Sequence, residues 1–163
     1  MTRWLPAACV LAALVVTACG APPNKEMDQA QGAIDAARAA GADRYAATEY
    51  AAATDALKRS EDAATQRDYR QALNEALDSR EHAQNAAREA ADTKAQVRGE
   101  VEREMAQIAA LIAEANTRLA AATRARAPRR VLDGPRQALA AVDKSVQKAG
   151  EAVKADDYLS AKA

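Results

Sequence analysis

Residues 68–127 read DYRQALNEALDSREHAQNAAREAADTKAQVRGEVEREMAQIAALIAEANTRLAAATRARA, and this stretch contains no proline. Asp68 and Gln71 form a start similar to a capping box, with Asp68 as the N-cap and Gln71 at the N3 position. Pro128 follows directly and closes the segment. An unbroken helix here would be roughly 90 Å long at a rise of about 1.5 Å per residue. The sequence therefore predicts one long helix that the other elements share.

Apolar and small residues follow alternating steps of three and four in two parts of this stretch. The first part comprises Leu73, Ala76, Arg80, Ala83, Ala87 and Ala90, and the second comprises Met105, Ile108, Ile112, Ala115, Leu119 and Ala122. Between the two parts, Val97, Val101 and Met105 are four residues apart, which shifts the seam in the manner of a stutter. Gly99 lies at this shift, so the sequence predicts a kink or a break there rather than a straight rod.

Two shorter helices are predicted before the long one. Pro22 and Pro23 cannot propagate a helix, and Asn24 is expected to be the N-cap of a helix over residues 25–40. Gly41 would end this helix, because glycine accepts the left-handed conformation that follows many helices. A second helix is predicted over residues 46–65 from apolar residues spaced three, four and seven apart.

A last helix is predicted over residues 135–154, with Gly134 and Pro135 as its N-cap and N1 residues. Ala155, Asp156 and Asp157 would then turn the chain into the short segment YLSAKA. The stretch AATQRDYRQA at 63–72 is similar to AVKADDYLSA at 152–161, at an offset of 89 residues. The similarity indicates either an internal duplication or a chance match between alanine-rich helices.

The composition predicts an all-α protein. Of 163 residues, 47 are alanine, and the aromatic residues are four tyrosines and one tryptophan. Alanine favours helix and lets helices pack closely, but it gives only a thin core. The 23 basic and 23 acidic residues cancel, which gives no reason to expect a partner of nucleic acid. We expect elongated antiparallel helical hairpins, or a bundle, that share one long helix and are partly coiled-coil-like.

The N-terminal segment MTRWLPAACVLAALVVTACG has the layout of a secretory signal peptide. Arg3 precedes an apolar run over residues 5–16, which is too short to span a membrane comfortably. The run is apolar on all sides, whereas a core helix should be amphipathic. Val16-Thr17-Ala18-Cys19 resembles the lipobox of bacterial lipoproteins. The resemblance implies that residues 1–18 are removed and that Cys19 carries acyl chains. A disulfide is the alternative, but Cys9 lies within the segment to be removed.

Lipidation would make residues 19–24 a tether and would join the protein to a membrane through its N-terminal lipid. Stable anchoring requires more than one acyl chain. In the sorting rule of Gram-negative lipoproteins, an aspartate after the cysteine retains the protein in the inner membrane, and here Gly20 occupies that position. We therefore expect a location in the cell envelope, at the outer membrane and facing the periplasm.

Residues 26–95 resemble an alanine-rich helical domain of unknown function found in bacterial periplasmic lipoproteins. The matching residues are Gly41-Ala42, Tyr45-Ala46, Glu49-Tyr50, Ala53, Leu57 and Asp68-Tyr69. The departures are Ala47 where proline is usual, Tyr50 for leucine and Arg67 for glycine. Relatives are described as tetratricopeptide-like, and some carry a peptidoglycan-binding domain of the outer-membrane protein A type, of which this sequence has no counterpart. The resemblance implies no catalytic residues. We therefore expect a helical domain over residues 25–97, whose third helix continues into a helical extension over residues 98–163. The extension includes the possible degenerate repeat.

No catalytic or metal-binding constellation is visible in the sequence. His82 is the only histidine and cannot build a usual zinc site, so we expect a solvated residue with Asp78 as its helical ion-pair partner. No phosphate-binding loop, nucleophile elbow or HExxH pattern occurs. We expect no enzyme, no metal and no cofactor. Tyr45, Tyr50 and Tyr69 would fill gaps beside alanine with their hydroxyls in water, or alternatively line a peptide groove.

Between residues 118 and 136 the sequence has six arginines and only one acidic residue, Asp133. They are Arg118, Arg124, Arg126, Arg129, Arg130 and Arg136. They indicate either a solvated helix end or a patch for an anionic partner, such as peptidoglycan, a teichoic-like polymer or lipopolysaccharide.

The leading functional prediction is a non-enzymatic, membrane-anchored periplasmic lipoprotein with a structural or adaptor role in the envelope. The alternative is a tetratricopeptide-like module that binds a periplasmic protein. The oligomeric state stays open, because the seam over residues 105–122 could pair with the last helix or with another chain.

Overall fold

The computed structural model describes residues 21–162, which form helices and no strands. The helices are α1 (Asn24–Ala39), α2 (Ala42–Tyr45), α3 (Ala47–Thr65), α4 (Tyr69–Arg124), α5 (Arg129–Lys154) and α6 (Tyr158–Lys162). The predicted all-α class, with antiparallel helices that share one long helix, is confirmed. The predicted signal peptide and Cys19 lie outside the described residues.

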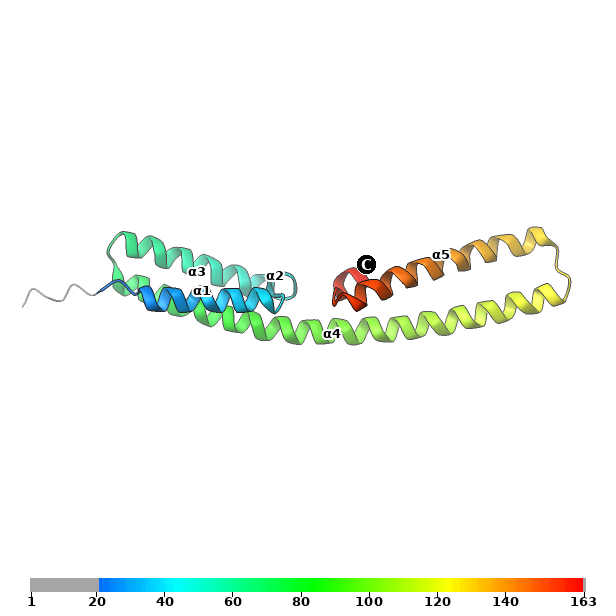
Figure 1. Ribbon diagram of the computed structural model, residues 1–163, viewed down its shortest axis with the longest axis horizontal. Helices are drawn as coiled ribbons and strands as arrows, with labels where there is room; N and C mark the ends of the chain where they lie inside the picture. The colour runs from blue at the N-terminus through cyan, green and yellow to red at the C-terminus, as the bar shows by residue number, and fades with distance from the viewer. Residues whose placement is uncertain (1–20, 163) are drawn as a thin grey trace, which may run out of the picture. The chain divides into compact units, whose positions relative to one another are not determined.

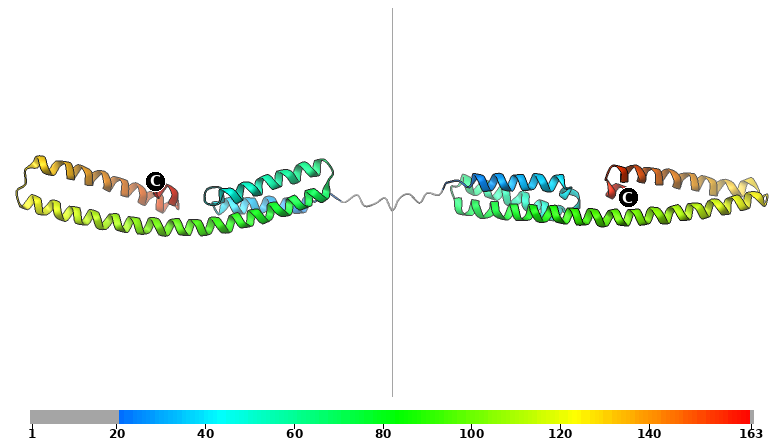
Figure 2. Two further views of the ribbon diagram at one scale, coloured as in Figure 1. Left: turned by 180° about the vertical axis from the view of Figure 1, so that it is seen from behind. Right: turned by 60° about the horizontal axis from the view of Figure 1, so that its bottom comes forward.

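The chain divides into two compact units, one up to Ala91 and one from Asp92 onward, and α4 contributes to both. In the first unit, α1 and α3 lie beside the first part of α4 (Figure 1). In the second unit, α5 runs back along the last part of α4, and α6 follows after a tight turn (Figure 2). The boundary between the two units, after Ala91, lies before residue 98, where we predicted that the C-terminal extension begins.

The core of the first unit consists mainly of alanine, as the composition predicts. Ile34 is 2% exposed and packs with Leu57 from α3 and with Ala30, Ala53 and Ala83, which have no exposed surface. Small side chains let the three helices approach closely, so few large residues are needed to fill the space between them.

Two buried serines join α3 to α4. The Ser60 hydroxyl donates to the Ala72 carbonyl at 2.7 Å, and the Ser79 hydroxyl donates to the Ala53 carbonyl at 2.8 Å. Both serines are completely buried. Each hydroxyl is therefore satisfied by a backbone oxygen of the neighbouring helix, which fixes the register of the pair.

The start of α1 differs from the prediction, and its end agrees. Asn24 is the first residue of the helix rather than its N-cap, because the Pro23 carbonyl already accepts the amide of Met27 at 3.0 Å. Gly41 lies in the left-handed region with φ of 87°, and its amide donates to the Arg38 carbonyl at 2.8 Å. Gly41 thus ends the helix as predicted.

A single helical turn, α2, follows Gly41 and was not predicted. It buries Ala42 and Tyr45 before the chain enters α3 at Ala47, one residue after the predicted start. Four residues are too few for a hydrophobic period to be visible in the sequence.

The predicted break at Gly99 does not occur, because α4 is helical without interruption from Tyr69 to Arg124. Glycine within a helix costs only about 1 kcal/mol relative to alanine. Strong helix formers surround Gly99, and their preference outweighs this cost.

The predicted start of the last helix at residue 135 is also wrong. α5 begins at Arg129 after an extended Pro128, so the connector RRVLDG is helical and Pro135 lies within the helix. Proline there removes one backbone hydrogen-bond donor. The burial of Leu132, which is 6% exposed, holds the preceding turn in place.

The turns that precede Tyr69 and Tyr158 share one backbone geometry. Arg67 and Asp156 both lie in the left-handed region, with φ of 62° and 58°. In both turns, the next residue donates its amide to the carbonyl five positions earlier, at 3.0 Å and 2.9 Å. This is the hydrogen bond of a Schellman helix end.

The helices after these two turns are capped in the same way. Asp68 accepts the Gln71 amide at 3.0 Å, and Asp157 accepts the Ser160 amide at 3.2 Å. The N-cap role predicted for Asp68 is therefore confirmed. The turn at Arg126 has the same backbone geometry, with Ala127 donating to the Ala122 carbonyl at 3.1 Å, so only the aspartate cap distinguishes the two turns at an offset of 89 residues, and the duplication stays a prediction.

Candidate functional site

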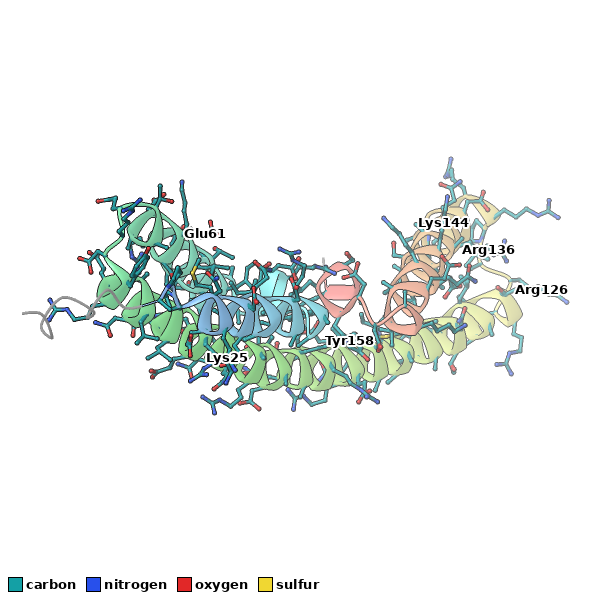
Figure 3. All side chains as sticks on the ribbon, turned by 60° about the vertical axis from the view of Figure 1, so that its left-hand side comes forward. Lys25, Glu61, Arg126, Arg136, Lys144 and Tyr158 are labelled. Carbon is teal, nitrogen blue, oxygen red and sulfur yellow. The ribbon has the colours of Figure 1, made fainter. Side chains whose placement is uncertain are left out.

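The predicted arginine patch lies at the end of the second unit where α4 turns into α5. Arg118 and Arg124 belong to α4, Arg126 lies in the turn with φ of 61°, and the other three belong to α5. All six side chains are exposed. Figure 3 shows Arg126 pointing away from both helices. The structure therefore brings the six residues to one end of a helical hairpin.

Two of the six arginines are neutralised by acids in their own helices. Arg118 pairs with Glu114 at 2.5 Å and Arg136 pairs with Asp133 at 3.9 Å. Glu114 lies just outside the stretch that the sequence singled out. The other four, Arg124, Arg126, Arg129 and Arg130, have no ion pair with any residue between 21 and 162, although Nε of Arg124 donates to the Ala120 carbonyl at 3.4 Å.

The helix dipole explains only part of this charge. A helix C-terminus favours cations, which suits Arg124 in the last turn of α4. Arg129 and Arg130, by contrast, are the first two residues of α5, where the positive end of the dipole disfavours cations. The stabilising effect of a helix C-terminus therefore does not apply to these two residues, although both are exposed to solvent.

His82 is half-buried rather than fully solvated, and it bridges two helices. Its Nδ1 atom lies 2.9 Å from Oε2 of Glu49 on α3. The predicted partner, Asp78, lies on the same helix as His82, whereas tertiary packing brings Glu49 closer. The contact is that of a structural pair within the first unit.

The three tyrosines of the first unit differ in their surroundings. The prediction that each hydroxyl reaches water is wrong for Tyr45, whose hydroxyl is buried and has no hydrogen-bond partner among the described residues. The Tyr50 hydroxyl accepts a hydrogen bond from Nε of Arg38 at 2.7 Å. Tyr69 is half-buried at the start of α4. Tyr45 and Tyr50 therefore act mainly as packing residues.

α6 is held against α4 by a cluster of charged and aromatic residues. Tyr158 is 5% exposed, its hydroxyl donates to Asp156 at 2.7 Å, and the Lys94 ammonium lies 5.9 Å from its ring centre. The hydrogen bond to Asp156 raises the pKa of Tyr158, because it stabilises the protonated hydroxyl.

A second contact of α6 joins Lys162 to Glu100. The Lys162 ammonium donates to Oε2 of Glu100 at 2.6 Å. This hydrogen bond is the main cause that lowers the pKa of Glu100 and raises the pKa of Lys162. The first residues after the tight turn are therefore fastened to α4 by both packing and charge.

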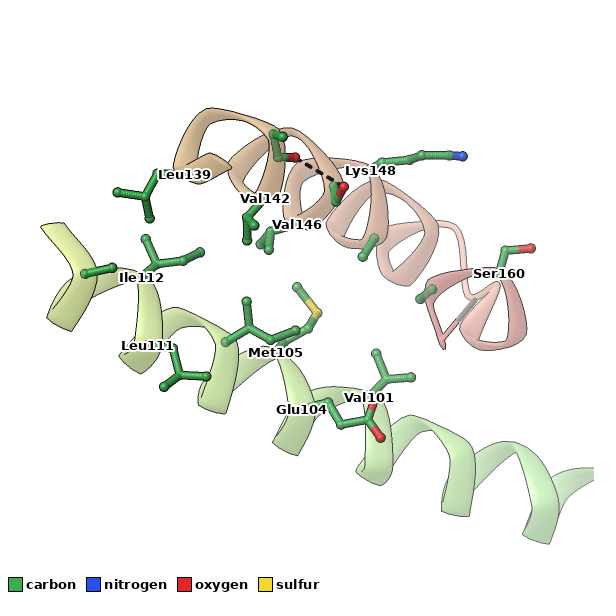
Figure 4. Close-up of a pocket in the computed structure, with 16 residues that line it drawn as sticks. Val101, Glu104, Met105, Leu111, Ile112, Leu139, Val142, Val146, Lys148 and Ser160 are labelled. Carbon is green, nitrogen blue, oxygen red and sulfur yellow. Dashed lines mark hydrogen bonds between the residues drawn. The ribbon is translucent and has the colours of Figure 1, made fainter. Parts of the chain in front are cut away.

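An apolar groove lies between α4 and α5 in the second unit, with Ser160 and Ala161 of α6 at one end, and the sequence did not predict it as a site. One part has a volume of about 910 Å³, and a second part of about 490 Å³ continues toward the hairpin end. The two parts share Ala115, Leu139 and Val142. Figure 4 shows Met105 and Ile112 pointing toward Val142 and Val146, whereas Leu111 points away from α5.

The described residues hold no group of three or more histidine, cysteine, aspartate or glutamate side chains that could bind a metal ion. Among residues 21–162, no helix combines the length and the hydrophobicity needed to cross a membrane.

Comparisons of the chain with known protein families, with curated proteins and with solved structures find no match. The resemblance of residues 26–95 to the lipoprotein domain therefore stays a prediction.

Proposed function

We propose that this protein is a non-enzymatic, lipid-anchored protein of the bacterial cell envelope with a structural or adaptor role. The observation that carries the proposal is the sequence Val16-Thr17-Ala18-Cys19 at the end of an apolar N-terminal run. Cys19 would carry the lipid, and the helices from Asn24 onward would project into the periplasm from the outer membrane.

The direct test is mass spectrometry of the N-terminus of protein purified from membranes. We expect a chain that begins at Cys19 and carries acyl groups. Cys19→Ser should abolish the modification and leave the chain unprocessed, and Cys9→Ser is the matched control that should change neither. An unmodified Cys19 in the native chain would refute the proposed anchor.

A second variant tests the expected membrane. Gly20→Asp places an aspartate directly after the lipidated cysteine, which should move the protein from outer-membrane to inner-membrane fractions in a density gradient. Gly20→Ser is the control and should leave the distribution unchanged. Equal distributions for Gly20→Asp and the native chain would contradict the outer-membrane assignment.

The unpaired arginines support an anionic envelope polymer as the partner of the hairpin end. Arg126, Arg129 and Arg130 are exposed and form no ion pair among the described residues, since Asp133 pairs with Arg136, and two of them lie where the helix dipole is unfavourable. We expect the protein to cosediment with purified sacculi at low salt and to be released at high salt, because exposed charges are screened.

Replacement of these three arginines by alanine should remove the cosedimentation. The matched control replaces three exposed arginines of the first unit, namely Arg59, Arg70 and Arg88. The control should bind as the native chain does. Equal loss in both variants would show a dependence on net charge rather than on the patch.

A protein-binding module is the second candidate, and the groove between α4 and α5 is the observation that favours it. Pull-down from solubilised envelopes separates the two functions. Enrichment of sacculi supports the structural role, whereas one stoichiometric protein partner supports the module. Hydrolase activity in the purified protein would overturn both.

A further inference from the structure

The groove of the second unit is lined by a second heptad-like seam on each of its helices. The α4 seam is Glu104, Ile108, Leu111, Ala115, Arg118 and Ala122, and the α5 seam is Val131, Pro135, Ala138, Val142, Ser145 and Ala149. In both helices, successive members are four, three, four, three and four residues apart. Eight of the twelve members are alanine, valine, isoleucine or leucine, and apolar residues at this spacing are typical of helices that pack against a further helix.

The groove is incompletely filled. Leu111 is 64% exposed, Val131 is 60% exposed and Val142 is 41% exposed. Among the described residues from Asp92 onward, only Val101, Leu132 and Tyr158 are buried. The first unit buries many more side chains because α1, α3 and α4 enclose its core. Two helices with the short α6 cannot enclose their apolar seams in the same way.

We propose that the groove binds the groove of a second copy of this chain. The two α4–α5 hairpins would form a four-helix bundle with twofold symmetry, in which the two α4 helices run antiparallel. This inference does not depend on the lipidation of Cys19, so either proposal can fail alone.

The dimensions of the groove suit such a dimer. The seams cover about 20 residues of each helix, which is about 30 Å at the helical rise, and two adjacent helices are about 20 Å wide. The face of each copy is therefore about 600 Å², and the dimer would bury about 1,200 Å². This area lies at the lower end of the range for stable protein interfaces.

The charges within the α4 seam favour the antiparallel arrangement. Glu104 lies near one end and Arg118 near the other, with Leu111 midway. In an antiparallel coiled coil, Leu111 of one copy would meet Ala115 of the other, and Arg118 would lie within about one turn of Glu104. Arg118 is 79% exposed beside Glu114, so it can contact a second acid. Parallel α4 helices would instead place like charges together.

The first test is the mass of the full-length chain with Cys9 and Cys19 replaced by serine, measured by sedimentation equilibrium in density-matched detergent. We expect a dimer. Leu111→Glu should raise the dissociation constant at least about 30-fold, because it buries a charge at the centre of the interface. Leu77→Glu is the matched control, because Leu77 is an exposed leucine of the same helix in the first unit and should leave the dimer intact.

A charge exchange tests the pairing of the two ends. Glu104→Arg alone should weaken the dimer about tenfold or more, and adding Arg118→Glu to the same chain should restore the affinity. Circular dichroism should show the same helix content in each variant. A double variant that binds no more tightly than Glu104→Arg alone would refute the antiparallel pairing.

Disulfide trapping tests the register. We would mix one chain that carries Leu111→Cys with another that carries Ala115→Cys, both without the native cysteines. The antiparallel dimer predicts that mixed disulfides between the two chains form faster than either homodimer. Preferential linkage of position 111 to itself would refute the arrangement.

A native chain that stays monomeric up to about 100 μM, or a dimer that Leu111→Glu leaves intact, would overturn the inference. A helix of another protein would then be the occupant to seek.

Discussion

Gly41 and Gly32 should respond with opposite signs to the same substitution by alanine. Gly41 follows α1 with φ of 87°, and an added Cβ would lie 3.2 Å from Cδ2 of Tyr45. The left-handed conformation costs a residue with a side chain about 1–2 kcal/mol, and the contact with the buried tyrosine adds to this cost. Gly32 lies within α1 and would place its Cβ near no other atom within 4 Å. Alanine there should stabilise the helix by about 1 kcal/mol.

The difference between Gly41→Ala and Gly32→Ala reports the native conformations and is about 1–2 kcal/mol, to which the contact with Tyr45 adds. Both substitutions reduce the entropy of the unfolded chain equally, so this contribution cancels. Urea unfolding of the full-length chain, followed by circular dichroism, measures each free energy of unfolding. For a unit of this size, 1 kcal/mol corresponds to about 4–8 °C in Tm. Equal signs for the two variants would refute the left-handed geometry of Gly41.

Gly99→Ala extends the same reasoning to α4. An added Cβ at Gly99 meets nothing within 4 Å, and a continuous helix should gain about 1 kcal/mol. A loss of stability would show that the chain departs from helix at this position.

Tyr45→Phe should leave the free energy of unfolding unchanged or raise it by up to about 1 kcal/mol in urea titrations, because the substitution removes a buried hydroxyl that has no partner. Ile34→Ala should cost about 2–5 kcal/mol, whereas Leu77→Ala should cost about 1 kcal/mol or less, because Ile34 is 2% exposed and Leu77 is 37% exposed. Lowering the pH below the usual Glu100 pKa of 4.5, and through its lower folded-state value, should release α6, which amide NMR signals can follow. At high pH, the contact should weaken only above the usual Lys162 pKa of 10.5, and Glu100→Gln should remove the acid transition.

Local patterns were sufficient to predict most helix ends. Gly41 and Asp68 carry out the predicted roles, because a left-handed residue and an N-cap depend on the few residues around them. The predictions at Pro135 and Gly99 were wrong because they relied on the local preference of a single residue. Their unfavourable local preferences are outweighed by neighbouring helix formers and by the burial of Leu132.

Contacts between distant residues could not be predicted from the spacing within one helix. His82 pairs with Glu49 across 33 positions, and Lys162 pairs with Glu100 across 62. The groove was not predicted because the seam over residues 105–122 was considered with one partner at a time, either the last helix or another chain. The spacing of Val131, Ala138 and Ser145 was visible in the sequence and could have indicated a second packing face.

The sequence by itself determined the all-α class and the alanine-rich packing, because composition and periodicity are local properties; the anchor at Cys19 rests on a short motif and stays a prediction. The tertiary structure decided which faces remain open. It unites the six arginines at one hairpin end and leaves an apolar groove between α4 and α5. Whether a seam is buried depends on how many helices surround it, and only the packed chain shows that α1 completes the first unit while the second unit has only the short α6.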